Sequence, residues 1–125
     1  DVRLRLASGK KISAVEYIRV FAVRGRVIAE FNETLQMFDA LLTPTTPLPA
    51  IPVSECDQCV APMSRLTRAA NLLDLCALAV PCGFDEIGLP LSLQIIGRAY
   101  DEARVLRIGW AYENATDWHT RRPAL

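Results

Sequence analysis

The clearest periodic pattern in the sequence predicts one long helix, which begins after Ser13 and continues to about Phe38. Ser13 and Glu16 have the spacing of a capping box, in which each side chain binds a backbone N–H group of the other residue. The apolar positions that follow are spaced alternately by four and three residues: Tyr17, Phe21, Ile28, Phe31, Leu35 and Phe38. One position of this stripe holds Arg24. A guanidinium in that position needs an acidic partner, a path to solvent along its stem, or a pocket to face.

Three apolar segments predict strands. Residues 39–43 are short, apolar and followed by a proline, so we interpret them as a short buried strand. Residues 75–80 form a continuous apolar run, which is typical of a central strand that is buried on both faces. In residues 89–95, leucine and isoleucine alternate with other side chains, which predicts a strand with one polar face. The turn residues 85–88 would join the last two strands as a hairpin.

The remaining segments predict a loop and two further helices. Five prolines in residues 44–62 exclude a helix or a central strand, and this long loop is either a binding loop or a plain surface crossover. Residues 64–73 predict a short helix, and the last helix opens at Asp101 and Glu102 and frays near Asp117. The order of elements predicts an α/β fold. Because three strands and two long helices make a thin domain, we expect this chain to lack part of the cover that residues 75–80 need.

Composition limits the classes of partner. The chain has 14 Lys and Arg against 14 Asp and Glu, so its formal net charge is zero. This balance argues against a broad basic face for nucleic acid or for an anionic membrane. No apolar run approaches the roughly 18 residues that would span a bilayer. The first residue is not Met and the opening falls within a helical pattern. We therefore expect a globular piece of a longer chain, with neither nucleic acid nor membrane as partner.

The cysteines and the single histidine form no obvious metal site. Cys56 and Cys59 have the C-x-x-C spacing of zinc and redox motifs, but they lie in the proline-rich stretch. Cys76 and Cys82 would be about 20 Å apart on an extended strand, too far to complete one zinc site. We therefore expect ordinary reduced thiols and no metal. His119 is the only histidine, and a lone histidine in a polar tail is more often solvated than a catalytic base.

The residues also lack a recognisable nucleophile with its base. None of the five serines lies in a G-x-S-x-G motif, and the only lysines are the neighbours Lys10 and Lys11. The sequence contains no G-x-G-x-x-G motif and no P-loop. Taken by themselves, the residues indicate an α/β piece without a complete active site. One function compatible with this is a non-catalytic module for interaction or self-association.

Several segments nevertheless resemble, in order and spacing, those of the amidase signature family. They are Asp39-Ala40-Leu41-Leu42-Thr43-Pro44-Thr45-Thr46-Pro47, Thr67-Arg68-Ala69-Ala70-Asn71-Leu72, Ala79-Val80-Pro81-Cys82-Gly83-Phe84, residues 88–98 (Gly-Leu-Pro-Leu-Ser-Leu-Gln-Ile-Ile-Gly-Arg), Asp101-Glu102, Ala111-Tyr112-Glu113 and Trp118-His119. The resemblance covers nearly the whole chain. It implies that residues 1–125 are a single C-terminal segment of a larger amidase-type domain.

The resemblance also implies a chemistry. Members of this family hydrolyse or transfer carboxamides, using a Ser nucleophile, a second Ser in a cis peptide and a Lys base, with no cofactor. That triad lies upstream of the part seen here, and no residue of this chain matches it. The family fold is a mixed sheet wrapped by helices, whose C-terminal part completes the sheet and lines part of the substrate pocket. We therefore expect a cytoplasmic enzyme that acts on small amides. We expect this chain alone to be inactive, and to need the N-terminal part or a second copy as its partner.

The segments do not all resemble the same branch of the family. Residues 71–75 resemble the allophanate hydrolase branch, and Asp74-Leu75-Cys76 stands where the family often has Gly-Leu-Pro, whereas residues 88–98 resemble the general amidases. In the glutaminyl-tRNA amidotransferase branch, an Asp and an Arg read the amino acid end of the substrate. The Arg matches Arg24, which is therefore the substrate-binding candidate. The Asp position holds Ser64. Together with the neutral charge, this departure argues against the tRNA-dependent branch.

Overall fold

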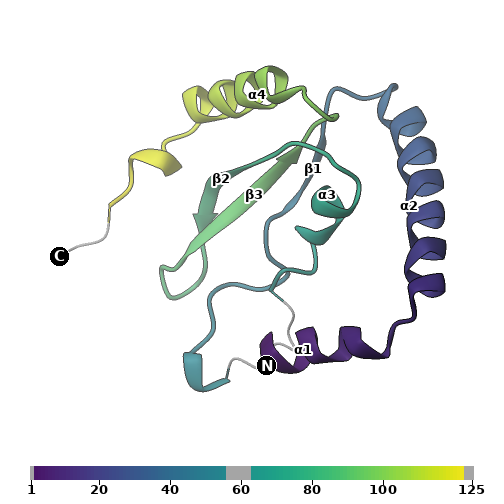
Figure 1. Ribbon diagram of the computed structural model, residues 1–125. Helices are drawn as coiled ribbons and strands as arrows, with labels where there is room; N and C mark the ends of the chain where they lie inside the picture. Colours follow the sequence, from purple (N-terminus) through teal and green to yellow (C-terminus); the bar gives the residue numbers. More distant parts are fainter. Residues whose placement is uncertain (1, 56–62, 123–125) are drawn as a thin grey trace.

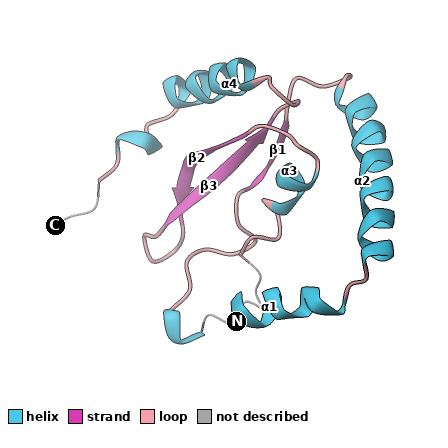
Figure 2. Cartoon of the chain, in the orientation of Figure 1, coloured by secondary structure: helices cyan, strands magenta, loops and turns pink. Residues whose placement is uncertain are grey.

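The computed structural model describes residues 2–55 and 63–122, and Figures 1 and 2 show a small sheet with helices around it. The helices of this described part are α1 (Val2–Ser8), α2 (Ala14–Leu35), α3 (Arg68–Leu72) and α4 (Glu102–Ala115), and the strands are β1 (Leu41–Pro44), β2 (Ala77–Phe84) and β3 (Pro90–Ile96). Short 3₁₀ turns occupy Gly9–Lys11, Val53–Glu55 and Trp118–Thr120. The α/β fold class is therefore confirmed.

The long helix begins as predicted. The Ser13 hydroxyl oxygen accepts a hydrogen bond from the Glu16 backbone N–H at 3.2 Å, and the Glu16 carboxylate accepts one from the Ser13 backbone N–H at 2.8 Å. The bond from this backbone N–H, followed by that from the Ser13 hydroxyl, lowers the pKa of Glu16. The capping box is confirmed, and α2 ends at Leu35, three residues before the predicted end.

The order of strands in the sheet corrects one prediction. The order is β1-β3-β2 with both pairs antiparallel, so the apolar segment predicted as the central strand forms β2 at an edge. The central strand is β3, where Gln94, Ile95 and Ile96 are 4%, 0% and 2% exposed. The tight hairpin pairs β2 with β3 on one side only, and β1 takes the other edge of β3. Among the described strands, β3 is therefore the one that is paired along both edges, and its last three residues are buried.

Two other predictions need smaller corrections. The segment predicted as a buried strand does form β1, but Leu41 and Leu42 are 39% and 55% exposed because this strand is also at an edge. The short helix predicted for residues 64–73 is helical only in α3, and turns precede it. The long loop is irregular up to the turn at Val53–Glu55, and its later part, residues 56–62, lies outside the described residues.

The hairpin turn and the last helix follow the predictions. The Asp85 carboxylate accepts hydrogen bonds from the backbone N–H groups of Ile87 and Leu89 at 3.0 and 2.7 Å, and Gly88 has φ +86°, which favours glycine. α4 starts at Glu102 and ends at Ala115, close to the predicted bounds. The turn and the C-terminal helix are therefore confirmed.

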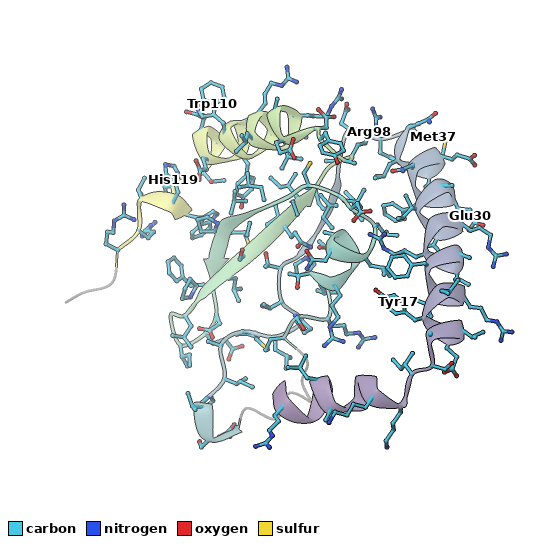
Figure 3. All side chains as sticks on the ribbon, viewed as in Figure 1. Tyr17, Glu30, Met37, Arg98, Trp110 and His119 are labelled. Atoms are coloured by element: carbon cyan, nitrogen blue, oxygen red, sulfur yellow. The ribbon has the colours of Figure 1, made fainter. Side chains whose placement is uncertain are left out.

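The core lies where α4 packs on β2 and β3. Val80, Ile95 and Val105 form its buried centre. By contrast, the predicted stripe of α2 is largely uncovered: Tyr17 and Phe21 are 59% and 51% exposed, although their rings contact each other edge to face. Figure 3 shows Tyr17 pointing from α2 toward α3. Within the described residues, the buried cluster lies between the sheet and α4, and Leu35 on α2 with Ala70 and Leu73 at α3 are further buried apolar residues.

Close packing of backbone against this core makes Gly97 sensitive to substitution. A Cβ atom on Gly97 would lie 2.4 Å from Cγ2 of the buried, stiff Val105 side chain and 3.0 Å from Sγ of Cys76. Gly97→Ala should therefore lower the free energy of unfolding by about 1–3 kcal/mol, measured as a lower urea midpoint.

The matched control is Gly109→Ala in α4. Its Cβ would meet the flexible end of Leu78 at 2.4 Å, which can rotate away, and alanine gains about 1 kcal/mol of helix propensity over glycine. Its urea midpoint should stay close to that of the wild-type protein. Equal losses for both variants would contradict this account of the packing.

Candidate functional site

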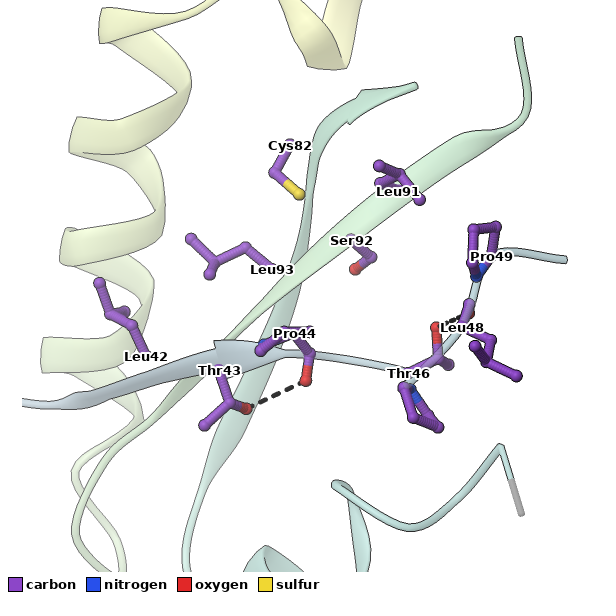
Figure 4. Close-up of a pocket in the computed structure, with 11 residues that line it drawn as sticks. Leu42, Thr43, Pro44, Thr46, Leu48, Pro49, Cys82, Leu91, Ser92 and Leu93 are labelled. Carbon is purple, nitrogen blue, oxygen red and sulfur yellow. Dashed lines mark hydrogen bonds between the residues drawn. The ribbon is translucent and has the colours of Figure 1, made fainter. Parts of the chain in front are cut away.

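An apolar depression lies on one side of β1 and β3, where β1 runs into the proline-rich loop. It has a volume of about 440 Å³ and is lined mainly by apolar side chains (Figure 4). Its lining residues come from β1, the loop after it, β2 and β3: Leu42, Thr43, Pro44, Thr46, Pro47, Leu48, Pro49, Cys82, Leu91, Ser92 and Leu93. We call it the proline cleft. Its size and apolar walls suit a small organic molecule.

A β-bulge places Cys82 in this cleft. Pro81 pairs with Ser92 and Gly83 pairs with Leu91, so Cys82 is the extra residue between two consecutive positions of β3. Gly83 has φ +143°, which relieves the chain at this irregularity. Bulges commonly redirect a side chain beside a functional site. The sequence offered no signal for the bulge except the adjacent Pro81 and Gly83.

Hydroxyl groups at the cleft are hydrogen-bonded within the protein. The Ser92 and Thr45 hydroxyls lie 2.8 Å apart, and the backbone N–H of Thr45 donates to the carbonyl of Ser92 at 2.9 Å. Farther along the same strand pair, the Gln94 side-chain amide donates to the Thr43 hydroxyl at 3.1 Å. These contacts fix the end of β1 and the first residues of the loop. The cleft therefore has a rigid wall that can orient a bound group.

Three serines of the described part form side-chain hydrogen bonds with groups other than lysine. Ser13 bonds to Glu16, Ser64 accepts from Arg68 Nε at 3.1 Å, and Ser92 bonds to Thr45. A serine needs a base within hydrogen-bond reach to become a nucleophile. What these three hydroxyls do in the described structure is fix local geometry.

Arg24, the predicted substrate-binding residue, pairs with the segment that ends α3. Its Nη2 lies 2.5 Å from Oδ1 of Asp74, and its Nε donates to the carbonyl of Leu72 at 2.7 Å. The Arg24 side chain is 27% exposed. It is not among the residues that line the proline cleft. The structure therefore supplies the acidic partner that the apolar stripe demanded, while leaving part of the side chain accessible.

The other candidate residues from the sequence make no hydrogen bond or ion pair with Arg24 in the described part of the chain. His119 lines a separate cleft of about 630 Å³ beside Phe84 and Trp118, whose rings contact edge to face. Cys76 and Cys82 are free thiols, while Cys56 and Cys59 lie outside the described residues. In residues 2–55 and 63–122, no group of three His, Cys, Asp or Glu is placed to hold a metal ion. No helix in the same part is long and apolar enough to cross a membrane.

Two arginines that sequence reasoning missed hold β1 in place. Arg98 donates to the carbonyls of Leu35, Gln36 and Phe38 at 3.1–3.3 Å, and thus caps the end of α2. Figure 3 shows Arg98 at the end of the sheet next to this helix terminus. A cation at this position also interacts favourably with the helix dipole. Hydrophobic periodicity carries no signal for such a contact, because the partners are backbone carbonyls about 60 positions away in the sequence.

Arg104 makes the second of these ties. It bonds to Asp101 at 2.8 Å and to Asp39 at 2.5 Å, linking the start of α4 to the residue pair that precedes β1. The hydrogen bond to Asp101, more than the charge of Asp39, raises the pKa of Arg104 above its usual value. The strand that ends in the proline cleft is thus anchored at its start by an ion pair.

Comparison with known proteins decides the family. The sequence model of the family described as Amidase matches residues 2–106. The chain belongs to the amidase signature family. The resemblance seen in the sequence is therefore confirmed, and the fold agrees with it. Over 91% of this chain, the crystal structure of an amidase superposes with a TM-score of 0.81 at 29% sequence identity, and the chain covers 28% of that structure.

Other relatives of this amidase-family chain are glutamyl-tRNA(Gln) amidotransferase subunits. One from a Synechococcus strain is 41% identical, and one from Chloroflexus aggregans is 42% identical, each over 87% of this chain. The crystal structure of the corresponding Thermotoga maritima protein has a TM-score of 0.74 at 37% identity, over 93% of this chain. This chain spans 22% and 23% of the first two relatives and 27% of the third.

These relatives weigh against one inference from the sequence. Ser64 and the neutral charge argued against the tRNA-dependent branch, yet two amidotransferase subunits named for a tRNA substrate are 41% and 42% identical to this chain. A single changed position is a weak indicator. The net charge is a weak indicator too. This chain spans about a quarter of the length of its relatives, and its charge says nothing of the charge of the other three quarters. Neither Ser64 nor the charge therefore decides the branch of this amidase-family chain.

Proposed function

We propose that this chain forms one wall of the substrate site in an enzyme that hydrolyses or transfers carboxamides. Residues 1–125 would be the C-terminal segment of a single larger domain, with the Ser nucleophile, the second Ser and the Lys base supplied by the rest of that domain. No cofactor enters this chemistry, and the enzyme would act in the cytoplasm. The observation that carries the proposal is the family match over residues 2–106, which includes every element of the proline cleft.

The architecture of the chain supports a wall more than a catalytic centre. The proline cleft is apolar, its hydroxyls are already bonded within the protein, and a bulge aims Cys82 into it. Such a surface can hold the hydrocarbon part of an amide while reactive groups approach from the opposite side. Arg24 would bind a polar end of the substrate, because part of its side chain stays accessible.

The uncovered apolar residues support a further aspect of the proposal. Tyr17 and Phe21 on α2, and Leu42 on β1, are each more than half exposed. Apolar patches of this kind mark surfaces that pack against another part of a protein. We assign them to the contact with the N-terminal part of the enzyme. The alternative, a non-catalytic module that associates with itself, draws on the same observation, and the experiment below distinguishes the two.

The test is to fill the proline cleft in the complete enzyme. Cys82→Phe puts a bulky ring into the depression, and it should raise KM for a small amide such as butyramide by about tenfold or more, because the methylene groups of the substrate lose their place. Ile87→Phe on the hairpin turn is the matched control, because Ile87 is 80% exposed and outside the cleft. An unchanged KM in the Cys82 variant, with its fold intact by circular dichroism, would contradict the proposed wall and favour the association module.

A further inference from the structure

The turn that follows α4 forms one wall of a second cleft. Residues Trp118–Thr120 pack beside β2 (Figure 1), and the Trp118 and Phe84 rings meet edge to face with their centroids 6.1 Å apart. The cleft lined by this turn and by the β2–β3 hairpin has a volume of about 630 Å³. We call it the aromatic cleft, and it shares no lining residue with the proline cleft. Its size lies in the range of sites that hold small molecules.

Hydrogen bonds within the turn fix the shape of this wall. The backbone N–H and the hydroxyl of Thr120 both donate to the carbonyl of Asp117, at 3.0 and 2.7 Å. The Arg121 backbone N–H donates to the carbonyl of Trp118 at 3.3 Å, and its Nη2 donates to the Asp117 carboxylate at 2.6 Å. The wall therefore has a defined shape before any ligand binds.

The described residues that line the aromatic cleft are apolar or basic, and none of them is acidic. Phe84, Leu89 and Trp118 contribute large apolar side chains, and the basic residues are His119, Arg121 and Arg122. Acidic and basic residues balance over the whole chain, so two arginines beside a histidine are a local excess of positive charge. An anion with an apolar body complements such a lining.

The two arginines keep N–H donors for an anion. Arg122 forms no ion pair with the described residues, and its Nη1 makes long hydrogen bonds of 3.3 and 3.4 Å to the carbonyls of His119 and Arg121. Because these two residues line the cleft, the bonds hold the Arg122 guanidinium beside it. Arg121 pairs with Asp117, but both side chains are more than half exposed, and such an exposed pair is weak. Each guanidinium has five N–H donors, so these contacts leave several unused.

We propose that the aromatic cleft binds a small aromatic anion. Its ring lies against Trp118 and Phe84, which offer both faces and edges for aromatic contacts. Its oxyanion group accepts hydrogen bonds from Arg121 and Arg122, whose planar donor sets match carboxylate and phosphate oxygens. The anionic group stays near solvent, because both arginines are exposed, so little of its hydration is lost. This site is independent of the proposed function, since the proposal assigns it no part in amide chemistry.

Isothermal titration calorimetry on the complete enzyme tests the proposal with three probes. Phenyl phosphate carries a ring and an anion, methyl phosphate carries only the anion, and phenol carries only the ring. Phenyl phosphate should bind about tenfold or more tightly than either of the others, and its binding should weaken with added salt. Equal affinities for phenyl phosphate and methyl phosphate would contradict the ring contact.

A double variant locates the binding site. Arg121→Gln together with Arg122→Gln should raise Kd for phenyl phosphate about tenfold or more, because both guanidinium groups are lost. Arg107→Gln is the matched control, since Arg107 is equally exposed to solvent but lies on α4 outside the cleft, and its Kd should equal that of wild type. Wild-type affinity in the double variant, or no binding of phenyl phosphate to the wild-type enzyme, would overturn the inference. Neither result bears on the amide assay that tests the proposed function.

Discussion

Replacing Arg98 by alanine should lower the free energy of unfolding of the chain by about 2–3 kcal/mol, since hydrogen bonds to charged groups contribute about 1.5–3 kcal/mol. The Arg98 guanidinium donates to three carbonyls at and just after the last turn of α2. Without it, these carbonyls lose a charged donor at the point where the chain turns toward β1. Urea unfolding followed by circular dichroism measures the change as a lower midpoint with an unchanged slope.

Two variants define the mechanism of this loss. Arg98→Lys retains the charge near the helix terminus, but a single ammonium group cannot reproduce the planar set of donors, so its midpoint should fall between wild type and Arg98→Ala. Arg107→Ala is the control, because the Arg107 side chain is exposed on α4. It should stay within about 0.5 kcal/mol of wild type. An Arg98→Ala midpoint equal to that of Arg107→Ala would show that the cap contributes no stability.

The elements of this fold that depend on local chemistry were predictable from the sequence. The capping box of Ser13 and Glu16 marked the start of α2, and the alternation after Gly88 marked β3 and its hairpin. These signals need only neighbouring residues. The family resemblance, carried by several short segments in order, added the expectation of a piece of a larger amidase domain.

The arrangement of strands was not predictable from those signals. The apolar run that forms β2 indicated burial on both faces, and burial depends on which strands and helices pack beside it. In the described residues, α4 covers one face and β1 lies on the far side of β3, so β2 stays at an edge. A run of apolar residues does not by itself distinguish an edge strand that a further part of the domain covers from a central strand.

The residues of the candidate site were likewise predictable only in part. Arg24 was found because its charge interrupts an apolar stripe, but its partner Asp74 was not, since the contact spans 50 positions. The Cys82 bulge depends on the register between two strands, which no single segment encodes. Contacts that rest on long-range geometry became visible only in the structure.

The other large expected effect is the loss of amidase activity when the chain is separated from the rest of the enzyme. The 125-residue chain alone should show no turnover of simple primary amides. Its Ser13, Ser64 and Ser92 hydroxyls form hydrogen bonds with Glu16, Arg68 and Thr45, and none of these partners is a lysine. Without an activated nucleophile, a binding wall provides only a small part of the rate enhancement of a complete triad. The complete enzyme is the positive control and should hydrolyse or transfer the same amides.

Ammonia release from acetamide, butyramide and succinamate, measured for the purified chain and for the complete enzyme in parallel, shows where the nucleophile lies. We expect release by the complete enzyme and none above the buffer rate by the chain. Release by the chain alone that disappears on Ser64→Ala or Ser92→Ala would contradict this expectation, because the nucleophile would then lie within these 125 residues.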